Sequence, residues 1–504
     1  MKVFTSEQIR RWDEYSIANE PISSYELMQR ASLAFSTFFE KKILLENKKI
    51  HIFCGSGNNG GDGLCIANIL SKKHENVFVY LFESHSKSPD NQQAIQDLTI
   101  DSAKIFSINQ DNNWQEKIDT IDKNDFVIDA LLGSGLNRPV EGFLENLIFS
   151  INQKRATVVS VDVPSGLFCD EKTSHESINA DYTFTFQSPK LAFFFPENQD
   201  KVGEWSMLNI DLHQDFFKAE KTENYYISSD IIKQIYTPRK KFDHKGTFGA
   251  SLILAGSYGK MGAAVLATRA CLRTGAGLLT TYIPKIGYDI MQISVPEAMV
   301  LTDQNVWNIS DVPNLKPYRA IGAGMGIGTS KETVIAFEKL IEFYKQPLVL
   351  DADALNILSF RQDLLANLPE NTILTPHVKE FERMFGECQN DWERYEKAKA
   401  KAIELKVIIV LKGAHSCVAA PDGKCYFNTT GNPGMATGGS GDVLAGILTS
   451  LIAQGYPPLE ATLFGVYLHG LAGDLAAKNK SQEAMTAGDI VDFLGKAYKK
   501  IQKS

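Results

Sequence analysis

Residues 432–452 read Asn-Pro-Gly-Met-Ala-Thr-Gly-Gly-Ser-Gly-Asp-Val-Leu-Ala-Gly-Ile-Leu-Thr-Ser-Leu-Ile, a glycine-rich turn that runs into an apolar stretch. Gly438, Gly439 and Gly441 have no Cβ, so the backbone can turn tightly and bring its N–H groups close to a ligand. The apolar stretch from Val443 to Ala453 predicts a helix. The amides of the turn would lie at the positive N-terminus of this helix, which is a favourable place for a phosphate group.

Asp442 is the one acidic residue of this turn. A carboxylate repels phosphate, so Asp442 is poorly placed to bind it but well placed to accept a proton from an attacking hydroxyl group. Phosphoryl transfer needs such a base beside amides that stabilise the anion. The alternative is an ordinary glycine turn in which Asp442 caps the helix.

The size and composition of the chain restrict its class. Its 504 residues are too many for one ordinary domain and predict two or three. The 44% of hydrophobic and 22% of charged residues are typical of a soluble globular protein. A net charge of −8 argues against a nucleic-acid partner, because such partners require a basic surface. Seven cysteines without a Cys-x-x-Cys pair indicate reduced thiols rather than a disulfide framework or a zinc site.

The beginning of the chain and its apolar runs predict a cytoplasmic protein. The first residues, Met1-Lys-Val-Phe-Thr-Ser-Glu-Gln, lack the apolar core of a signal peptide. No apolar run approaches the roughly 20 residues that a helix needs to span a bilayer. We therefore expect no membrane partner.

The first part of the chain predicts two helices and a βαβ unit. Residues 7–45 predict the two helices, which are separated near Pro21, and Ser23 or Ser24 could cap the second. A strand, a glycine-rich turn, a helix and a second strand follow at residues 50–54, 55–63, 64–71 and 77–82. This order is that of a βαβ unit.

The glycine-rich turn has two readings. Residues 55–60, Gly-Ser-Gly-Asn-Asn-Gly, match the dinucleotide-binding fingerprint, and Glu83 lies about where the ribose-binding acid should be. A Rossmann oxidoreductase is therefore one alternative. Against it, Asp62 stands where a pyrophosphate would lie, and Asn58 and Asn59 supply oxygens that the fingerprint does not require. Oxygen-rich turns suit a hard cation.

Two later strands also end in polar residues. Asp129 follows one strand and leads into a second glycine turn that contains Arg138, and Asp162 and Ser165 follow another strand. Ligands collect beyond the carboxyl ends of strands in an open parallel sheet. Asn59 and these residues therefore predict one polar pocket, although any single Asp could instead cap a helix or bind a loop amide.

These motifs resemble the YjeF N-terminal family, the NAD(P)H-hydrate epimerases. The resemblance covers residues 1–215 and rests on Asn58-Asn-Gly-Gly-Asp62, on Asp129 with Gly133 to Pro139, and on Asp162-Val-Pro-Ser165-Gly. It implies a Rossmann-like, three-layer α/β domain. Some relatives keep this fold as scaffolds for protein or RNA partners, so a binding protein is an alternative to an enzyme.

The resemblance also implies site residues for this domain. The hydrated nicotinamide nucleotide would contact two loops and one acid, namely Asn58, Asn59, Gly60, Gly61, Asp62, Gly133, Ser134, Gly135, Leu136, Asn137, Arg138, Pro139 and Asp162. A potassium ion would be held by Asn59, Asp129 and Ser165. Asp162 would be the catalytic acid that transfers a proton during epimerisation.

The second half of the chain predicts another α/β sheet. Polar, charge-mixed sequence between residues 211 and 245 indicates an interdomain connection. Buried strands are predicted after Gly249 and at residues 278–283, 320–322, 348–350, 372–374 and 407–411. Most of them alternate with helical stretches, which indicates a mainly parallel sheet with helices on both faces. No Gly-x-x-x-x-Gly-Lys-Ser/Thr occurs, so this is not a P-loop enzyme.

Chemically capable residues follow three successive strands of this half. Asp351 and Asp353 follow the first, His377 the second and Lys412 the third. Lys412 could place a point charge on a phosphate or merely be solvated, and His377 could contact a substrate or only hydrogen-bond locally. The two acids could bind magnesium through water or only fix neighbouring loops.

Together with residues 438–442, these segments resemble the YjeF C-terminal family, the ADP- or ATP-dependent NAD(P)H-hydrate dehydratases of the ribokinase-like fold. The resemblance covers residues 225–504 and rests on Ala255-Gly-Ser with Met261-Gly-Ala-Ala264, Gly322-x-Gly-x-Gly326, Asp351-Ala-Asp353-Ala-Leu-Asn356, Thr375-Pro-His377, Lys412-Gly413 and Gly438-Gly-Ser-Gly-Asp442. Val378-Lys379 departs from the Pro-Gly that relatives often have, which concerns the rim of the pocket and not the reaction.

The second resemblance likewise implies site residues. The nucleotide contacts would be Lys412, Gly413, Ala414, His415, Ser416 and Gly441. The contacts to the hydrated nucleotide would be Ala264, Gly326, His377 and Asp442, with Asp442 as the catalytic base. Magnesium would serve this domain, and ADP is the expected donor because the bacterial branch of the family generally prefers it.

The two resemblances imply one function for the whole chain. The first domain would interconvert the R and S epimers of hydrated NADH or NADPH. The second would use the S form and ADP to give NAD(P)H, AMP and phosphate. We expect a homo-oligomer. A vitamin or sugar kinase, which shares the Gly-Ser-Gly-Asp turn, is the rival enzyme but leaves the first domain unexplained.

Overall fold

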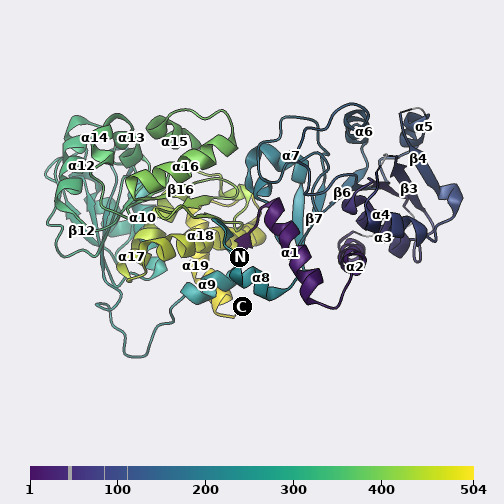
Figure 1. Cartoon of the computed structure of the whole chain (residues 1–504). Helices are drawn as coiled ribbons and strands as arrows, with labels where there is room; N and C mark the ends of the chain where they lie inside the picture. Colours follow the sequence, from purple (N-terminus) through teal and green to yellow (C-terminus); the bar gives the residue numbers. More distant parts are fainter. Residues whose placement is uncertain (44–47, 84–85, 111, 504) are drawn as a thin grey trace. The chain divides into compact units, whose positions relative to one another are not determined.

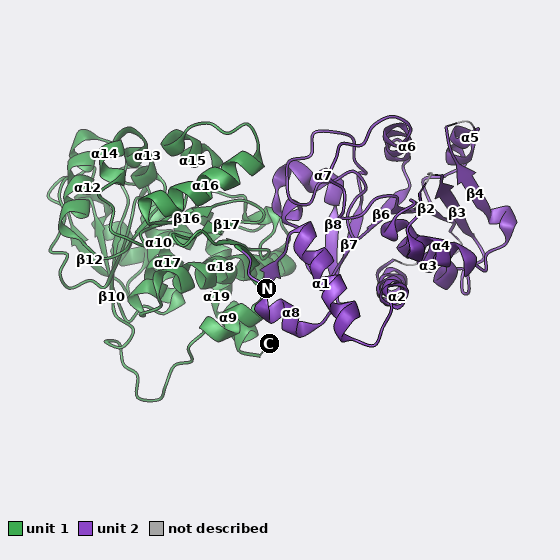
Figure 2. Cartoon of the chain, viewed as in Figure 1, with its two compact units in different colours: residues 1, 223–504 green, residues 2–222 purple. Residues whose placement is uncertain are grey.

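The alternating strands and helices fold into two mainly parallel sheets (Figure 1). The computed structural model describes residues 1–43, 48–83, 86–110 and 112–503. Unit 1 consists of Met1 and Glu223–Ser504, and unit 2 of Lys2–Thr222 (Figure 2). The end of the second predicted helix, beyond residue 43, lies outside the described residues.

Unit 2 is built on a parallel sheet with the strand order β4-β3-β2-β5-β6-β7-β8. Its strands are β1 (Lys2–Val3), β2 (Ile50–Cys54), β3 (Val77–Phe82), β4 (Ile105–Ile108), β5 (Phe126–Ala130), β6 (Thr157–Val161), β7 (Tyr182–Phe186) and β8 (Glu204–Leu208). Its α-helices are α1 (Ser6–Asn19), α2 (Ser24–Lys42), α3 (Asn58–Leu70), α4 (Pro89–Gln96), α5 (Trp114–Asp119), α6 (Phe143–Asn152), α7 (Gln199–Val202) and α8 (Gln214–Ala219). Short 3₁₀ turns occupy Ser102–Lys104, Leu191–Phe194 and Pro196–Asn198.

The strands of unit 2 present alternate side chains to two separate cores. Ile52 of β2 belongs to a buried cluster that includes Phe35 of α2, whereas its neighbour Phe53 belongs to a second cluster that includes Leu147 of α6. Successive side chains of a strand point to opposite faces, so each cluster covers one face of the sheet. The predicted three-layer α/β arrangement is confirmed.

One predicted boundary in unit 2 is wrong. The sequence places a loop over residues 55–63 before the helix, but α3 already begins at Asn58. A Cβ on Gly60 would lie 1.9 Å from the carbonyl oxygen of Gly55, so the helix can start this close to the strand only because residue 60 is glycine. The oxygen-rich residues therefore lie on the first turns of a helix.

Unit 1 is built on a larger sheet with the strand order β9-β18-β17-β16-β15-β14-β13-β10-β11-β12. Its strands are β9 (Asn224–Tyr226), β10 (Ala250–Leu254), β11 (Leu278–Ile283), β12 (Met299–Thr302), β13 (Ala320–Ala323), β14 (Leu348–Leu350), β15 (Ile373–Leu374), β16 (Ile408–Leu411), β17 (Cys417–Ala419) and β18 (Cys425–Phe427). The strands from β16 to β12 are parallel, whereas β17 is antiparallel to both β16 and β18. The sequence did not predict this antiparallel hairpin.

Helices cover both faces of the sheet of unit 1. They are α9 (Ser229–Ile235), α10 (Met261–Thr274), α11 (Tyr288–Ser294), α12 (Lys331–Phe343), α13 (Asp353–Phe360), α14 (Gln362–Leu365), α15 (Val378–Phe385), α16 (Asp391–Leu405), α17 (Ser440–Ala453), α18 (Pro458–Lys480) and α19 (Ala487–Lys503), with 3₁₀ turns at Lys285–Gly287 and Pro433–Met435. In Figure 1, α12 to α16 lie above this sheet and α17 to α19 below it. Residues 443–453 are all buried, because α17 packs between the sheet and the helices α10 and α18.

The segment that the sequence predicts as an irregular connection contains regular structure. Residues 211–245 include α8, β9 and α9. These elements are too short to show a clear hydrophobic period. In unit 2, Phe216 of α8 stacks on the buried ring of Trp12, with 6.1 Å between the ring centroids. Packing therefore fixes a helix that propensity alone does not predict.

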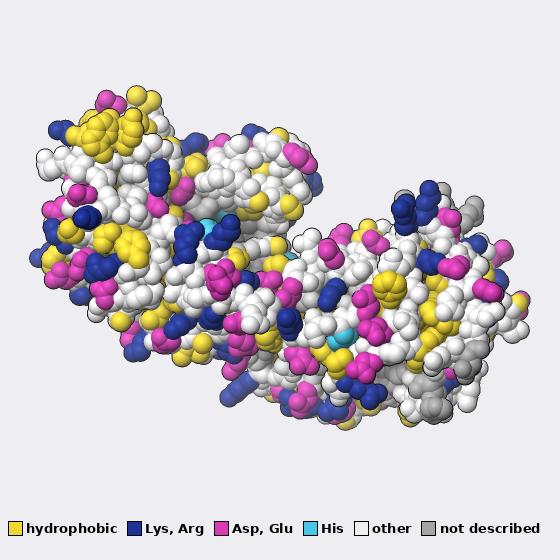
Figure 3. Space-filling model, turned by 90° about the horizontal axis from the view of Figure 1, so that it is seen from above, with side chains coloured by type: hydrophobic (Ala, Val, Ile, Leu, Met, Phe, Trp, Pro, Cys, Tyr) yellow, Lys and Arg dark blue, Asp and Glu magenta, His cyan; other side chains and the backbone are white. Residues whose placement is uncertain are grey.

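The surface carries charges of both signs. Figure 3 shows acidic and basic side chains interspersed over the face that it draws. Exposed pairs such as Arg361 and Asp363, 2.7 Å apart, are screened by solvent and contribute little to stability. Among the helices of the described residues, none is long and apolar enough to cross a membrane. The ion pairs with structural consequences are the buried ones, described below.

Candidate functional sites

In unit 1 the carboxyl ends of three neighbouring strands meet the turn that precedes α17. Lys412, after β16, pairs with Asp351, after β14, with 2.8 Å between Nζ and Oδ1. A Cβ on Gly441 would lie 3.1 Å from Oδ2 of Asp351 and 3.2 Å from Nζ of Lys412. The absence of a side chain at residue 441 therefore lets the turn lie directly against this ion pair.

Asp442 lies in the first turn of α17 and does not cap it. Gly439 is the N-cap, with a φ of +93° that favours glycine, so the helix-cap alternative for Asp442 is wrong. The carboxyl group of Asp442 has no hydrogen-bond or ion-pair partner among the described residues. Burial, and next the charge of Asp351, raise the pKa of Asp442 to about 7. This carboxyl group can therefore exchange a proton near neutral pH.

Lys412 is held between two acids. Besides Asp351, the carboxylate of Glu380 lies 3.9 Å from its Nζ. Burial lowers the pKa of Lys412, but the charges of Asp351 and Glu380 outweigh it and the pKa is raised. Lys412 therefore keeps its positive charge beside the helix N-terminus, as a phosphate group would require.

His377 is a helix cap. Its Nδ1 accepts hydrogen bonds from the backbone N–H groups of Lys379 (3.1 Å) and Glu380 (3.3 Å) at the start of α15. Burial, and next the charge of Lys412, lower the pKa of His377, so its ring is neutral. This is the local hydrogen-bonding role that the sequence allows, and Nε2 of the half-exposed ring lies 3.4 Å from Oε1 of Glu380.

The two acids after β14 fix neighbouring loops. Oδ1 of Asp351 accepts a hydrogen bond from the hydroxyl of Thr375, at 2.8 Å. Asp353 accepts one from the backbone N–H of Gly328, at 2.8 Å, and pairs with Lys260, at 3.1 Å. Oδ2 of Asp351 accepts no hydrogen bond from the described residues, whereas the other three carboxylate oxygens of Asp351 and Asp353 each accept at least one. This oxygen faces the turn before α17.

The remaining predicted residues of unit 1 lie around this site in different ways. Ala264 is fully buried in α10 within the hydrophobic core, so its side chain has no exposed surface for a ligand. Gly326 has a φ of +68° and closes the turn after β13 onto the turn after β10. Residues 412–416 connect β16 to β17, where Ser416 Oγ donates to the carbonyl oxygen of Gly413, at 3.1 Å. Burial lowers the pKa of His415 in the same connection.

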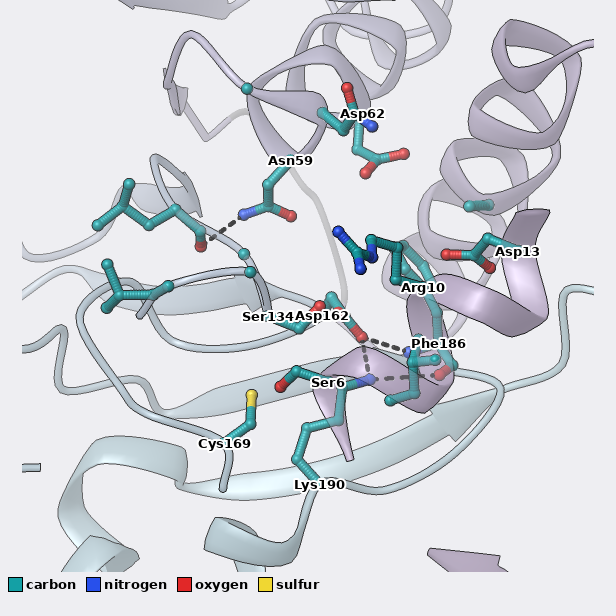
Figure 4. Close-up of a pocket in the computed structure, with 18 of the residues that line it drawn as sticks. Ser6, Arg10, Asp13, Asn59, Asp62, Ser134, Asp162, Cys169, Phe186 and Lys190 are labelled. Carbon is teal, nitrogen blue, oxygen red and sulfur yellow. Dashed lines mark hydrogen bonds and ion pairs between the residues drawn. The ribbon is translucent and has the colours of Figure 1, made fainter. Parts of the chain in front are cut away.

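In unit 2 a cavity of about 1160 Å³ lies beyond the carboxyl ends of the strands (Figure 4). Ten predicted residues line it, namely Asn58, Asn59, Asp62, Gly133, Ser134, Gly135, Leu136, Asn137, Arg138 and Asp162. Gly60 and Gly61 do not line it, because they pack against the backbone of Gly55 and the side chain of Met28. Pro139 also does not line it. The fold therefore brings together both predicted loops and the predicted acid.

Asp162 is the carboxylate of this cavity that is held by hydrogen bonds from three donors. Its Oδ1 accepts hydrogen bonds from the backbone N–H of Phe186 (2.9 Å), the hydroxyl of Thr185 (3.0 Å) and Nζ of Lys190 (2.6 Å). Its Oδ2 accepts none from the described residues. Figure 4 shows Asp162 among the residues that line the cavity. Its φ of +63° is rare outside glycine, so the packing holds it in a strained backbone conformation.

Asp129 and Ser165 do not line the cavity, and they form an oxygen-rich cluster with the loop after β5. The carboxylate of Asp129 is fully buried and accepts hydrogen bonds from Oγ (2.5 Å) and N (2.8 Å) of Ser165. Ser165 Oγ and the side-chain amide of Asn59 both donate to the carbonyl oxygen of Leu132, at 3.2 Å and 2.8 Å. Burial raises the pKa of Asp129, and no Lys or Arg of the described residues pairs with it.

Several residues of the cavity were missed in the sequence. Arg10 and Asp13 enter it from α1, and Lys190 lies behind Asp162. The helical spacing of α1 could have placed Arg10 and Asp13 near each other, but not toward this cavity. Glu83, the ribose-binding acid of the dinucleotide alternative, does not line the cavity and instead accepts a hydrogen bond from Asn109, at 2.5 Å.

These two sites define a class of protein with two α/β units, each with an acid at the carboxyl edge of a parallel sheet. Residues 251–496 match the family described as NAD(P)H-hydrate dehydratase, and residues 24–192 match the YjeF-related protein N-terminus. Among solved structures, a ribokinase-like superfamily protein from Enterococcus faecalis is 28% identical, with a TM-score of 0.50, and the match covers 56% of this chain and 98% of that chain. Unit 1 therefore has the predicted ribokinase-like fold.

Two relatives match almost the whole chain. A bifunctional NAD(P)H-hydrate repair enzyme from Moorella thermoacetica is 33% identical over 513 residues, which covers 98% of this chain and 96% of that protein. The enzyme of that name from Escherichia coli is 30% identical over 506 residues, which covers 98% of this chain and 93% of that protein. The chain belongs to the family of bifunctional NAD(P)H-hydrate repair enzymes.

Proposed function

We propose that this chain epimerises hydrated NADH and NADPH in unit 2 and dehydrates the S epimer in unit 1 at the expense of ADP. Family membership supports the pair of activities. The observation that carries the dehydratase assignment is the setting of Asp442, a carboxyl group without a partner at the start of a buried helix, next to the Lys412–Asp351 ion pair.

In the dehydratase step, Asp442 accepts the proton of the C6 hydroxyl while the hydroxyl oxygen attacks the terminal phosphorus of ADP. The bond from that phosphorus to the bridging oxygen breaks, and AMP leaves. Lys412 and the amides of the turn stabilise the charge on the transferred phosphoryl group. The C6–O bond then breaks with the help of the electron pair on N1, phosphate leaves, and C5 gives a proton to water, which restores the dihydronicotinamide. Hydroxide alone would be a poor leaving group.

In the epimerase step, the cavity of unit 2 would bind the hydrated nicotinamide nucleotide through the loops at residues 58–62 and 133–139. Asp162 would accept the proton of the C6 hydroxyl at its Oδ2, because its Oδ1 is already engaged by three donors. The volume of about 1160 Å³ leaves room for a nucleotide-sized ligand.

The predicted ions can be compared with the residues present. Around Asp129, buried oxygens without a cationic side chain fit a potassium ion held by Asn59, Asp129 and Ser165, whose charge would offset that of the carboxylate. Magnesium would enter unit 1 with the nucleotide phosphates, and Oδ2 of Asp351 is the oxygen left to bind its hydration shell. The expected homo-oligomer stays a prediction that light scattering can test.

The test is incubation of the full chain with mixed hydrated NADH epimers, with ADP or ATP, and with potassium or a large organic cation in its place. We expect complete conversion of both epimers with ADP and potassium, and an end point near the S fraction when the epimerase is inactive. A stable phosphorylated product in place of NADH and phosphate would favour the kinase alternative. No turnover in any condition would favour a binding protein.

A further inference from the structure

Seven carboxyl groups line the cavity of unit 2, namely Glu7, Asp13, Asp62, Asp90, Asp162, Asp170 and Glu171. Three of them, on three different elements, are labelled in Figure 4. Asp13 lies on α1, Asp62 on α3 and Asp162 directly after β6 (Figure 4). We propose that Asp13 is the catalytic acid that gives a proton to the substrate while Asp162 takes one. This role rests on the epimerase function proposed above.

The helix that carries Asp13 is anchored on both sides of it. The indole N–H of Trp12 donates to the backbone carbonyl of His213, at 2.9 Å, and the backbone N–H of His213 donates to Oγ of Ser16, also at 2.9 Å. A capping box between Thr5 and Gln8 fixes the start of the helix. Asp13 lies between these anchors, so its carboxyl group is held toward the cavity rather than free to leave it.

The carboxyl group of Asp13 has no partner, in contrast to that of Asp162. Among the described residues, nothing donates a hydrogen bond to it or forms an ion pair with it. The charged groups around it are Arg10 and Glu14 on its own helix, Asp62 on α3, and Asp162 with Lys190 across the cavity. Burial, and next the charge of Asp162, raise the pKa of Asp13 to about 7. Near neutral pH this group can therefore donate a proton to the substrate and take it back.

Asp62 is less suited to the same role. Burial, and next the charges of Asp162 and Asp13, raise its pKa well above the ordinary value. Its Oδ1 lies 3.5 Å from the hydroxyl of Ser32, which belongs to α2. The protonated form of Asp62 is thus favoured, and in that form the group donates a hydrogen bond rather than accepting a proton.

A donor and an acceptor on different elements satisfy the proton balance of an epimerisation at C6. Asp162 takes the hydroxyl proton, the C6–N1 bond breaks, its electron pair stays on N1, and C6 becomes an aldehyde carbon. Asp13 gives its proton to N1. Rotation about the C5–C6 bond presents the other face of the aldehyde, N1 attacks C6 and returns its proton to Asp13, and Asp162 returns the other proton to oxygen. No atom is gained or lost, and no oxidant is needed.

The experiment compares the full-length wild type with Asp13→Asn, and chromatography follows the R and S epimers in the absence of ADP. We expect the epimerisation kcat of Asp13→Asn to fall about 100-fold or more, with a smaller change in KM. In the wild type, kcat should fall as pH rises through about 7, because Asp13 must carry a proton. That fall should be absent from the residual activity of Asp13→Asn. A merely structural role of Asp13 would not explain this loss of the pH dependence.

Two further variants keep the result interpretable. Asp13→Glu retains a carboxyl group and should keep part of the rate together with the fall above neutral pH. Glu75→Gln changes an exposed acid of unit 2 that does not line the cavity, and it should epimerise like the wild type. Denaturant unfolding of unit 2 reports whether each variant is folded, and the ADP-dependent activity of unit 1 on the S epimer reports the amount of active chain.

The outcomes separate the two proposals. If the wild type epimerises and Asp13→Asn does so at the same rate and with the same pH dependence, the role of Asp13 is wrong and the epimerase function stands. The same conclusion follows if Asp62→Asn, and not Asp13→Asn, removes the fall at high pH. If the wild type does not epimerise at all, both proposals are overturned.

Discussion

Asp442 of unit 1 and Asp162 of unit 2 are the same type of residue in opposite surroundings. Asp162 receives three hydrogen bonds on one oxygen, among them that of the buried Lys190 at 2.6 Å. Asp442 has no donor among the described residues, and its burial and next the charge of Asp351 oppose its ionisation. Direct donors hold one carboxylate in a fixed position, whereas the other has no donor and can take up and release a proton near pH 7.

The largest expected effect tests the isolated acid. Asp442→Asn cannot accept the hydroxyl proton, so we expect ADP-dependent formation of NADH from the S epimer to fall about 1000-fold, within the range for loss of a catalytic base. Epimerisation by unit 2 should be unchanged. The absorbance of the dihydronicotinamide measures the first activity, and chromatography of the epimers measures the second.

A matched control for this variant is Asp422→Asn. Asp422 pairs with Lys424 at the surface of the same unit and does not belong to the site. The Asp422→Asn variant should dehydrate the S epimer like the wild type. Substantial turnover by Asp442→Asn would remove the contrast between the two acids.

The second prediction concerns Asp162 and its ion pair with Lys190. Lys190→Met leaves the carboxylate of Asp162 buried without its cation, and removal of one partner of a buried pair costs about 3–5 kcal/mol. We expect unit 2 to unfold at lower denaturant concentration and epimerisation to be lost.

The double variant Lys190→Met with Asp162→Asn should recover part of this free energy of unfolding, because no uncompensated charge remains. Lys72→Met, at an exposed position, is the control. A single variant as stable as the wild type would show that the charge of Asp162 does not depend on Lys190.

The third prediction is the pH dependence of the dehydratase. Asp442 must be ionised to act as a base, and its pKa is raised to about 7. The kcat/KM of the dehydratase for the S epimer should therefore rise about tenfold per pH unit below pH 7 and become level above pH 7. Epimerisation should show the opposite trend above pH 7 if Asp13 is its acid. Parallel profiles for the two activities would contradict the contrast.

The smallest expected effect concerns the glycine against the ion pair. In Gly441→Ala, the new Cβ would lie 3.1 Å from Oδ2 of Asp351 and 3.2 Å from Nζ of Lys412, so the pair must shift by a few tenths of an ångström. We expect KM for ADP to rise about tenfold, which corresponds to about 1.4 kcal/mol, with little change in epimerisation. Gly495→Ala in α19, where a Cβ meets nothing within 4 Å, is the control. An unchanged KM would mean that the nucleotide does not use this pair.

Much of the fold follows from local sequence patterns. Apolar runs such as residues 278–283 and 348–350 become the predicted strands β11 and β14, because their burial requires no distant information. The hairpin of β17 and β18 was missed, because two strands of three residues carry too little pattern. The glycine turn at residues 55–63 was misjudged, because only the close approach of Gly60 to Gly55 shows that a helix can begin at Asn58.

The sequence by itself determined two α/β units and the positions of Asp162 and Asp442, because strand ends and glycine turns are local features of the chain. Only the tertiary structure decided how each acid behaves. Lys190 is 28 residues from Asp162, and Lys412 is 61 residues from Asp351, yet packing brings each pair within hydrogen-bond distance. The protonation of a carboxyl group depends on the charges and donors within a few ångströms, and which residues supply them is decided by the fold.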